Sequence, residues 1–282
     1  MKVLFIGGTG NISSACSRLA VKKGIELFHM NRGKVKADIP AEVKTITADI
    51  KDKNKMQVAL GDLHFDVVVN FIAYTPDDVK QDIEIFSGRT KQYVFISSAS
   101  VYQKVGGHPV ITESTPLYNP YWDYSREKIA CEDLLNDEYR NNGFPITIVR
   151  PSHTYDTVIP VAIGSWTDYT IVDRMKKGQE IIIHGDGTSL WTITHADDFT
   201  RALVGLLGHQ QAVGHAESII DMHGTLLECI CSECSAVKKD INVIEHVKKF
   251  PLDLDVSPPV CGRVISKNNE KYPLSDIQES LY

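Results

Sequence analysis

The sequence lacks a long apolar run, an excess of basic residues and an internal repeat. Its apolar stretches fall well short of the roughly 20 residues that a transmembrane helix needs, and the strand-like start is too short for a signal peptide. The formal net charge of −6 argues against nucleic acid or an anionic membrane as a partner. We therefore expect a cytoplasmic protein that acts on a small molecule and does not bind a membrane.

A paired set of metal ligands at the usual spacing is also missing. The six cysteines include one cluster, formed by Cys229, Cys231 and Cys234. Its surroundings, "LLECICSECSAVKK", are typical of a helix, which directs Cys229 and Cys231 to different sides. Small buried helix residues are the alternative interpretation of this cluster. We expect reduced thiols and no metal site.

Short β-branched runs alternate with segments of helical spacing along the chain. Of its 282 residues, 43% are hydrophobic, which is enough for a sizeable core. The alternation predicts an α/β fold with a doubly wound parallel sheet. The expected strands are "KVLFIG", "IELFHM", "KTITAD", "DVVVNFI", "QYVFISS" and "ITIVRP".

A glycine turn, "GGTGNIS", follows the first expected strand and leads into a helix. This is the setting of a dinucleotide-binding fingerprint in a Rossmann fold. Gly7 allows the tight turn, and Gly10 lets the backbone approach a pyrophosphate at the helix N-terminus. Ser13 stands where a third glycine is usual, and we expect its small side chain to be accommodated. The alternative is a glycine turn that only joins a strand to a helix. Further candidate cofactor contacts in the turn are Thr9, Asn11 and Ile12.

The end of the second expected strand bears on the choice of cofactor. An acidic residue there binds the ribose 2′-hydroxyl of NAD, whereas an arginine accommodates the 2′-phosphate of NADP. Asn31 and Arg32 occupy this place, which favours NADP over NAD. An ordinary solvated turn is the alternative. Asp49 and Ile50, after the third strand, are candidates to flank the adenine.

Chemistry-bearing residues appear in "YWDYSREK" and "FISSASVY". Tyr124 and Lys128 are four residues apart at the start of an expected helix, so their side chains share one face. A lysine ammonium beside a phenol favours the phenolate, so we expect a lowered pKa for Tyr124. Ser98 ends a strand at the carboxyl edge of the sheet, where such folds bind ligands.

These motifs, in this order, resemble the extended branch of the short-chain dehydrogenase/reductase superfamily, the NAD-dependent epimerase/dehydratase family. The resemblance covers residues 1 to about 207. It implies that Ser98 polarises the substrate oxygen, that Tyr124 is the acid and base, and that Lys128 tunes Tyr124 and binds the nicotinamide ribose. The segments that carry it are "GGTGNIS", "NFIAY", "ISSASVY", "YSREK", "VRPSHTY" and "HGDGTSLWTITHADD".

The resemblance also implies a domain division and further cofactor contacts. Ala73 is expected to line the cofactor cleft, and the backbone after Arg150 and Pro151 is expected to contact the nicotinamide. Residues 1–155 are expected to form the dinucleotide-binding domain, completed by about residues 190–220. Residues 156–282 are then mainly a smaller substrate-binding subdomain, with an irregular tail over 248–282.

Departures from the family pattern narrow the expected reaction. Ala99 and Ser100 replace the Asp-Glu pair with which sugar dehydratases eliminate water, so such a dehydratase is not expected. Trp191 replaces the arginine that clamps a nucleotide diphosphate, and either stacks on a substrate ring or belongs to the core. Ser100 and His153 are further substrate candidates, although a structural histidine is the plainer interpretation of His153.

Two classes of function remain open. The first is an NAD(P)-dependent oxidoreductase or epimerase that transfers hydride at a hydroxyl or carbonyl carbon of a sugar-like or other small substrate. The second is a non-catalytic NAD(P)-binding sensor or an RNA-binding protein, like the chloroplast stem-loop-binding proteins of the same branch. The sequence does not separate an epimerase from a reductase, and it leaves open a homodimer, which is frequent in the family.

Overall fold

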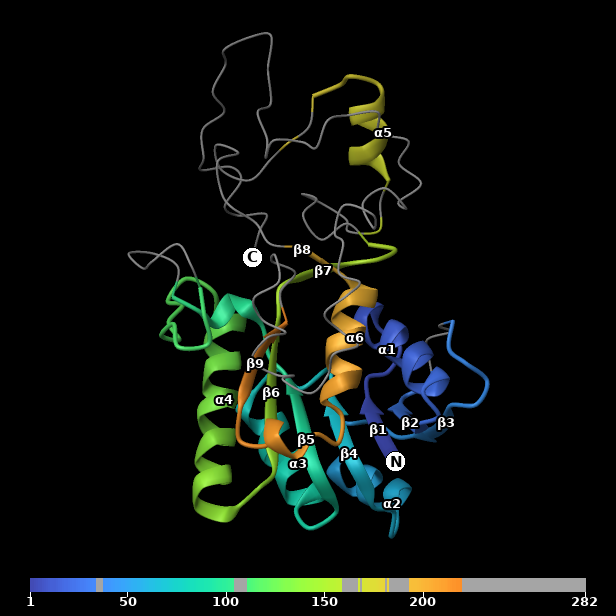
Figure 1. The fold of residues 1–282 in the computed structure, drawn as a ribbon, viewed down its shortest axis with the longest axis vertical. Helices are drawn as coiled ribbons and strands as arrows, with labels where there is room; N and C mark the ends of the chain where they lie inside the picture. The colour runs from blue at the N-terminus through green and yellow to red at the C-terminus, as the bar shows by residue number, and fades with distance from the viewer. Residues whose placement is uncertain are drawn as a thin grey trace. The chain divides into compact units, whose positions relative to one another are not determined.

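A parallel β-sheet forms the centre of the larger of two compact units (Figure 1). The computed structural model describes residues 1–33, 38–103, 111–158, 167, 169–180, 182 and 193–219. Within them the seven-stranded sheet has the order β3-β2-β1-β4-β5-β6-β9, and every neighbouring pair is parallel. All six predicted strands are confirmed. The strands are β1 (Lys2–Ile6), β2 (Glu26–Asn31), β3 (Lys44–Thr47), β4 (Phe65–Asn70), β5 (Thr90–Ile96), β6 (Ile146–Pro151) and β9 (Ala216–Ile219).

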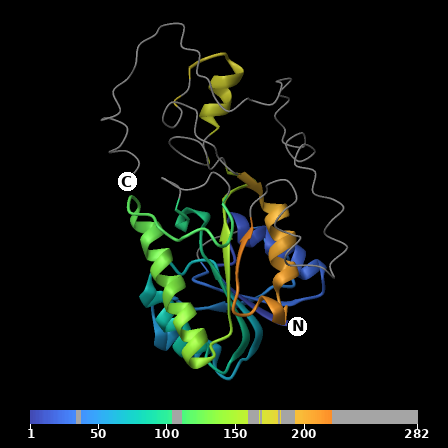
Figure 2. The same ribbon diagram turned by 60° about the vertical axis from the view of Figure 1, so that its left-hand side comes forward.

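Helices cover both faces of this sheet, as Figures 1 and 2 show. Helices α2 (Lys53–Leu60), α3 (Pro76–Phe86) and α4 (Asp123–Asn142) contribute to the core on one face. Helices α1 (Asn11–Lys22) and α6 (Ala196–Leu206) contribute to the core on the other. The fold is therefore the predicted doubly wound, Rossmann-type α/β fold.

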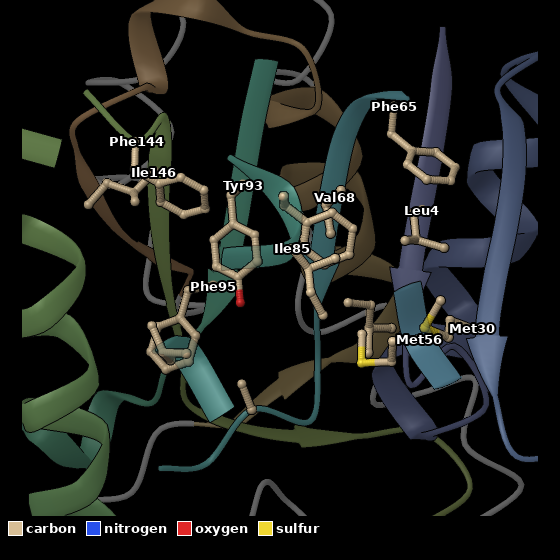
Figure 3. Close-up of a cluster of buried hydrophobic side chains, with 14 of the residues drawn as sticks. Leu4, Met30, Met56, Phe65, Val68, Ile85, Tyr93, Phe95, Phe144 and Ile146 are labelled. Carbon is tan, nitrogen blue, oxygen red and sulfur yellow. The ribbon is translucent and has the colours of Figure 1, made fainter. Parts of the chain in front are cut away.

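The central strands β1 and β4 are largely apolar because both of their faces are buried. Along β1, Leu4 belongs to the core on the face of α2 to α4, and Val3 and Phe5 belong to the core on the opposite face. Successive side chains of a strand point to opposite sides of the sheet, so a central strand needs apolar residues at every position. Figure 3 shows the first of these cores, with Tyr93 and Phe95 of β5 among its aromatic members.

The remaining described elements are short. β7 (His153–Tyr155) pairs with β8 (Ile193–His195), and 3₁₀ turns occur at η1 (Ala99–Val101) and η2 (Gln210–Ala212). The chain divides into two compact units. The larger holds the sheet, and the other contains α5 (Thr170–Lys176) among its described residues.

Several predicted features lie outside the described residues. These are Trp191, the cluster of Cys229, Cys231 and Cys234, and the tail 248–282. In the described part of the chain, Cys16 and Cys131 are free and buried, and no group of three metal-ligating side chains occurs. None of the helices described combines the length and apolarity needed to span a membrane.

The sheet order fixes where a ligand site is expected. The chain runs outward from β1 to β2 and β3, and then returns to place β4 on the other side of β1. The helices that follow β1 and β4 lie on opposite faces, and in such sheets the carboxyl ends of strands with this arrangement are the usual place for a ligand. The glycine turn follows β1, and Ser98 follows β5, so both lie at this edge.

Candidate active site

The glycine turn after β1 has two glycines with different requirements. Gly7 has φ of 82°, and a Cβ there would lie 2.7 Å from the Ile72 side chain, so the chain itself requires glycine. Gly10 is exposed, has φ of −85°, and a Cβ would meet only the Ser13 hydroxyl, at an ordinary 3.5 Å. The protein alone does not require glycine at position 10. A ligand that approaches the backbone closely would require glycine at position 10, so the turn fits a bound pyrophosphate.

Ser13 is built into this turn by hydrogen bonds. Its Oγ donates to the carbonyl oxygen of Gly7 at 2.9 Å and accepts from the amide of Gly10 at 2.8 Å. The serine therefore joins both ends of the turn to the first turn of α1. The sequence alone predicts only that its small side chain is accommodated, whereas the structure gives it two hydrogen bonds within the turn.

The first turn of α1 presents further features that suit a ligand. No acidic residue occurs in this turn, and the first amides of a helix have no partner within the helix. Asn11 donates from Nδ2 to the carbonyl of Thr154, whereas its buried Oδ1 has no hydrogen-bond partner among the described residues. Thr9 is half-buried, and Ile12 packs against the core beneath α1.

The predicted adenosine contacts gather at the ends of β2 and β3. The amide of Ala48 donates to the carbonyl of Asn31, which brings the segment of Asp49 and Ile50 beside the end of β2. Asn31 Oδ1 accepts from the Gly33 amide at 2.8 Å. Arg32 is exposed, so its guanidinium is available to a ligand at this edge.

Ser98, Tyr124 and Lys128 come together. The four-residue spacing predicts this for Tyr124 and Lys128, and the place of Ser98 after β5 puts it at the same edge. Ser98 precedes η1, and its Oγ accepts from the Ser100 amide at 3.1 Å. Tyr124 lies in the first turn of α4 and has a side-chain hydrogen bond to Ser98. Lys128 is one turn further along α4, with its Nζ 5.7 Å from the centre of the Tyr124 ring.

The expected lowering of the Tyr124 pKa is wrong for the protein on its own. Burial raises the pKa of Tyr124 to about 12, and nearby Tyr74 adds to this, against a lowering by the hydrogen bond from Ser98. The Lys128 ammonium instead donates to the carbonyls of Ala73 at 2.7 Å and Ile96 at 2.8 Å. Burial lowers the pKa of Lys128 itself to about 8.

Two aromatic rings that the sequence analysis did not single out flank Tyr124. The ring centres of Tyr74 and Trp122 lie 6.1 Å and 4.7 Å from that of Tyr124. Tyr74 is 46% exposed and Trp122 is 48% exposed, so both present an accessible face beside the phenol. No spacing rule identifies them, because Tyr74 comes from the loop after β4 and Trp122 precedes α4.

The other predicted residues have varied surroundings. Ser100 Oγ accepts from the Ser125 hydroxyl of α4 at 2.8 Å, so Ser100 fixes η1 to that helix. Pro151 is buried at the end of β6, and His153 is exposed in β7. His195 is the N-cap residue of α6, and its Nδ1 accepts from the amide of Asp197.

A buried ion pair that the sequence analysis missed supports the edge of the sheet. Glu132 of α4 and Arg150 of β6 form this pair, and the side chains are 0% and 5% exposed. Ser97 donates to the same carboxylate, and Arg150 also donates to the hydroxyl of Tyr102 at 2.8 Å. These bonds connect α4 and β6 to the segment that carries Ser98.

Comparison with known proteins assigns the family. The NAD dependent epimerase/dehydratase family matches residues 3–220. The chain belongs to this family. The predicted recognition is thereby confirmed, and membership of this family agrees with the Rossmann-type fold described above.

Curated relatives differ in what they do. The chain is 26% identical over 75% of its length to the chloroplast stem-loop binding protein of 41 kDa b from Arabidopsis thaliana, of which it covers 56%. It is 32% identical over 53% of its length to the UDP-glucose 4-epimerase of Lactobacillus helveticus, of which it covers 51%. The chain thus spans about half the length of these two relatives.

A solved structure supports the fold. The UDP-glucuronic acid 4-epimerase of Bacillus cereus, in complex with UDP-glucuronic acid and NAD, superposes with a TM-score of 0.61. The match covers 82% of this chain and 81% of that one at 20% identity. At this identity the likeness concerns the fold alone.

Proposed function

We propose that the chain is an NAD(P)-dependent oxidoreductase or epimerase that transfers hydride at a hydroxyl or carbonyl carbon of a small, sugar-like substrate. The observation that carries this proposal is the convergence of Ser98, Tyr124 and Lys128 at the sheet edge that also holds the glycine turn. A family of enzymes that includes UDP-glucose 4-epimerase supports it.

The chain's own residues would hold the dinucleotide along this edge. Gly7, Gly10 and the first amides of α1 would bind the pyrophosphate, whose negative charge the helix N-terminus favours. Asp49 and Ile50 would flank the adenine, and Ala73 and Pro151 would lie toward the nicotinamide. When bound, the nicotinamide supplies or accepts the hydride.

The proton chemistry would belong to Tyr124. Because its pKa is raised, the phenol is protonated at neutral pH and is ready to donate to an oxygen that gains negative charge. Ser98 would hold and polarise the same oxygen. Lys128 would bind the nicotinamide ribose, and its positive charge would then ease proton loss from Tyr124 in the reverse direction.

Residues around this site support a choice of cofactor and of reaction class, and three of them are candidate substrate contacts. Arg32 at the end of β2 favours NADP, because a guanidinium binds a phosphate with several donors at once. Ala99 and Ser100 offer no carboxylate beside Ser98 for the elimination of water, which favours an oxidoreductase or epimerase over a dehydratase. His153 and the exposed rings of Tyr74 and Trp122 are proposed to contact the substrate.

The first experiment identifies the nucleotide that the protein carries. The purified protein is denatured, the released nucleotide is identified, and the emptied protein is titrated with NADPH and NADH by fluorescence. An empty protein that binds NADPH tightly supports an exchanging reductase. Stoichiometric release of NAD⁺ supports an epimerase cycle and contradicts the proposed role of Arg32. Failure to bind either dinucleotide overturns the proposal.

A second candidate function rests on one relative. The similarity to a chloroplast stem-loop binding protein favours a non-catalytic protein of this fold that binds RNA. The net charge of −6 opposes it, because binding to phosphates requires a basic surface. A gel-shift titration with a stem-loop RNA separates the two: salt-sensitive RNA binding without turnover of any carbonyl substrate would favour this candidate.

A further inference from the structure

Three buried polar side chains lie beneath the glycine turn. Ser13 and Ser17 come from α1, and His29 comes from the neighbouring strand β2. They are 2%, 0% and 1% exposed, so water does not satisfy their polar atoms. The catalytic proposal assigns no role to Ser17 or His29.

The hydrogen bonds among them have a defined direction. Ser17 Oγ donates to the carbonyl of Ser13 at 2.7 Å, which uses the only proton of this hydroxyl. Ser17 Oγ also lies 2.8 Å from His29 Nε2, and it must act as the acceptor there. His29 is therefore the tautomer with its proton on Nε2. The chain of bonds runs from His29 through Ser17 to the backbone of Ser13, whose own hydroxyl joins Gly7 and Gly10.

The His29 ring also supports the turn directly. A Cβ on Gly8 would lie 2.5 Å from His29 Nδ1, so the ring packs against the backbone of the turn itself. On the other side, the ring stacks on Phe5 of β1, with centres 5.9 Å apart and planes at 17°. The bare Nδ1 has no hydrogen-bond partner among the described residues.

We propose that Ser13, Ser17 and His29 are positioning residues, which hold the glycine turn in the shape that accepts the dinucleotide pyrophosphate. The proposal rests on the proposed function, because it takes the turn as the pyrophosphate site. The ring of His29 supports Gly8 from below, and Ser13 fixes Gly7 and Gly10 from the side of α1. Ser17 links His29 to the backbone of Ser13. The usual third glycine of the fingerprint is replaced here by a hydrogen-bonded support.

The energetic cost of this arrangement argues for such a role. A buried acceptor without a partner destabilises a protein, and an apolar set of the same volume avoids that penalty. Glycine at position 13 would also allow α1 to pack closely on β1, which is the usual reason for a glycine at this position of the fingerprint. Glycine there would lose the hydrogen bonds of Ser13 to Gly7 and Gly10, besides the small conformational cost that glycine has in a helix. Departures from the simplest packing of this kind are typical of functional sites.

The test compares variants of the full chain by their Kd for NADPH and NADH. Ser13→Gly restores the usual fingerprint, Ser17→Ala removes the central hydroxyl, and His29→Leu removes the donor. We expect each to weaken binding of the preferred dinucleotide about three- to tenfold, the effect of one lost hydrogen bond. Ser14→Ala, a neighbouring serine of the same helix outside this network, serves as the matched control and is expected to bind as the wild type does.

Rescue by a conservative variant separates positioning from general stability. His29→Gln keeps an N–H donor for Ser17, and Ser17→Thr keeps the hydroxyl, so both are expected to bind within about twofold of the wild type. Melting temperatures without ligand are measured for every variant. Weakened binding in Ser13→Gly with an unchanged melting temperature supports the proposal. Unchanged or tighter binding in Ser13→Gly overturns it.

The tautomer of His29 gives an independent readout. Long-range ¹H–¹⁵N spectra of the imidazole are expected to show the proton on Nε2, with and without NADPH. A proton on Nδ1 would contradict the direction of the hydrogen bonds and so overturn the inference. If the wild type binds neither dinucleotide, the proposed function itself fails. If the wild type binds and the variants bind equally well, only the positioning role fails.

Discussion

At the scale of single residues, Tyr124 and Lys128 share one environment that moves their pKa values in opposite directions. Burial disfavours a charge, so the pKa of the phenol rises to about 12 and that of the ammonium falls to about 8. Both shifts favour the neutral form of the side chain. In the proposed site, a dinucleotide that engages Lys128 would change this balance, so the proposed acid and base function would depend on the bound cofactor.

We expect Tyr124→Phe to lower kcat at least about a hundredfold, because general acid and base groups contribute factors of 10² to 10⁴. Binding of the dinucleotide should stay within about twofold, since only the hydroxyl is removed. Tyr121→Phe, at a neighbouring tyrosine that is 66% exposed, is the control and should be fully active. The comparison is made by steady-state kinetics once a carbonyl substrate turns over. Full activity in Tyr124→Phe would contradict the assigned acid.

His29 is expected to make the protein acid-sensitive. Burial lowers its pKa from 6.5 to about 4 in the folded protein. The unfolded chain then binds more protons between these values, so stability is complete above pH 6.5 and is lost as the pH falls toward 4. The loss reaches about 3 kcal/mol at most. Asp82, whose pKa is raised to about 6 by burial, contributes with the opposite sign, so only the difference from a variant isolates His29.

Urea unfolding of wild type and His29→Gln at several pH values tests this. The stability of the variant relative to the wild type is expected to rise as the pH falls from 6.5 to 4. His64→Gln, at an exposed histidine, is the control and should follow the wild type. Parallel curves for wild type and His29→Gln would show that His29 does not carry the acid sensitivity.

At the scale of elements, the sequence predicts correctly those helices and strands whose position depends on the periodicity of apolar residues alone. The central strands follow from apolar runs, because both of their faces are buried, and the helix of Tyr124 and Lys128 follows from their spacing. The hydrogen bonds of Ser13 and the direction of the Lys128 ammonium depend on where a backbone carbonyl lies after folding. No local pattern encodes that position. The contact between the rings of Trp122 and Tyr124 likewise has no signal in the sequence.

The ion pair between α4 and β6 is expected to be critical for stability. Glu132→Ala leaves the Arg150 charge buried without its partner, which destabilises proteins by about 3–5 kcal/mol. Lys44→Ala breaks the exposed pair with Glu26 and is expected to cost less than about 1 kcal/mol. Urea unfolding at pH 7 measures both. Similar small effects for the two variants would show that the buried pair does not hold α4 to the sheet.

At the scale of the whole molecule, the proposed site draws on both halves of the sheet. The glycine turn and Arg32 follow β1 and β2, whereas Ser98 and the helix of Tyr124 belong to the half built from β4 to β6. A dinucleotide that spans this edge contacts both halves at once. Ligand binding of this kind stabilises the folded chain as a whole, by about 2.7 kcal/mol at a concentration of 100 times Kd.

Thermal unfolding with each dinucleotide therefore tests the site and the cofactor preference together. We expect NADP⁺ to raise the melting temperature more than NAD⁺ at equal concentration, because Arg32 is proposed to bind the 2′-phosphate. Arg32→Ala is expected to weaken NADP⁺ binding about tenfold or more, the effect of losing a hydrogen bond to a charged group, and to leave NAD⁺ binding nearly unchanged. Lys23→Ala, which removes the same charge at the far end of α1, should keep the wild-type difference. Equal melting temperatures with the two dinucleotides in the wild type would instead assign Arg32 to the solvated turn and leave the rest of the site intact.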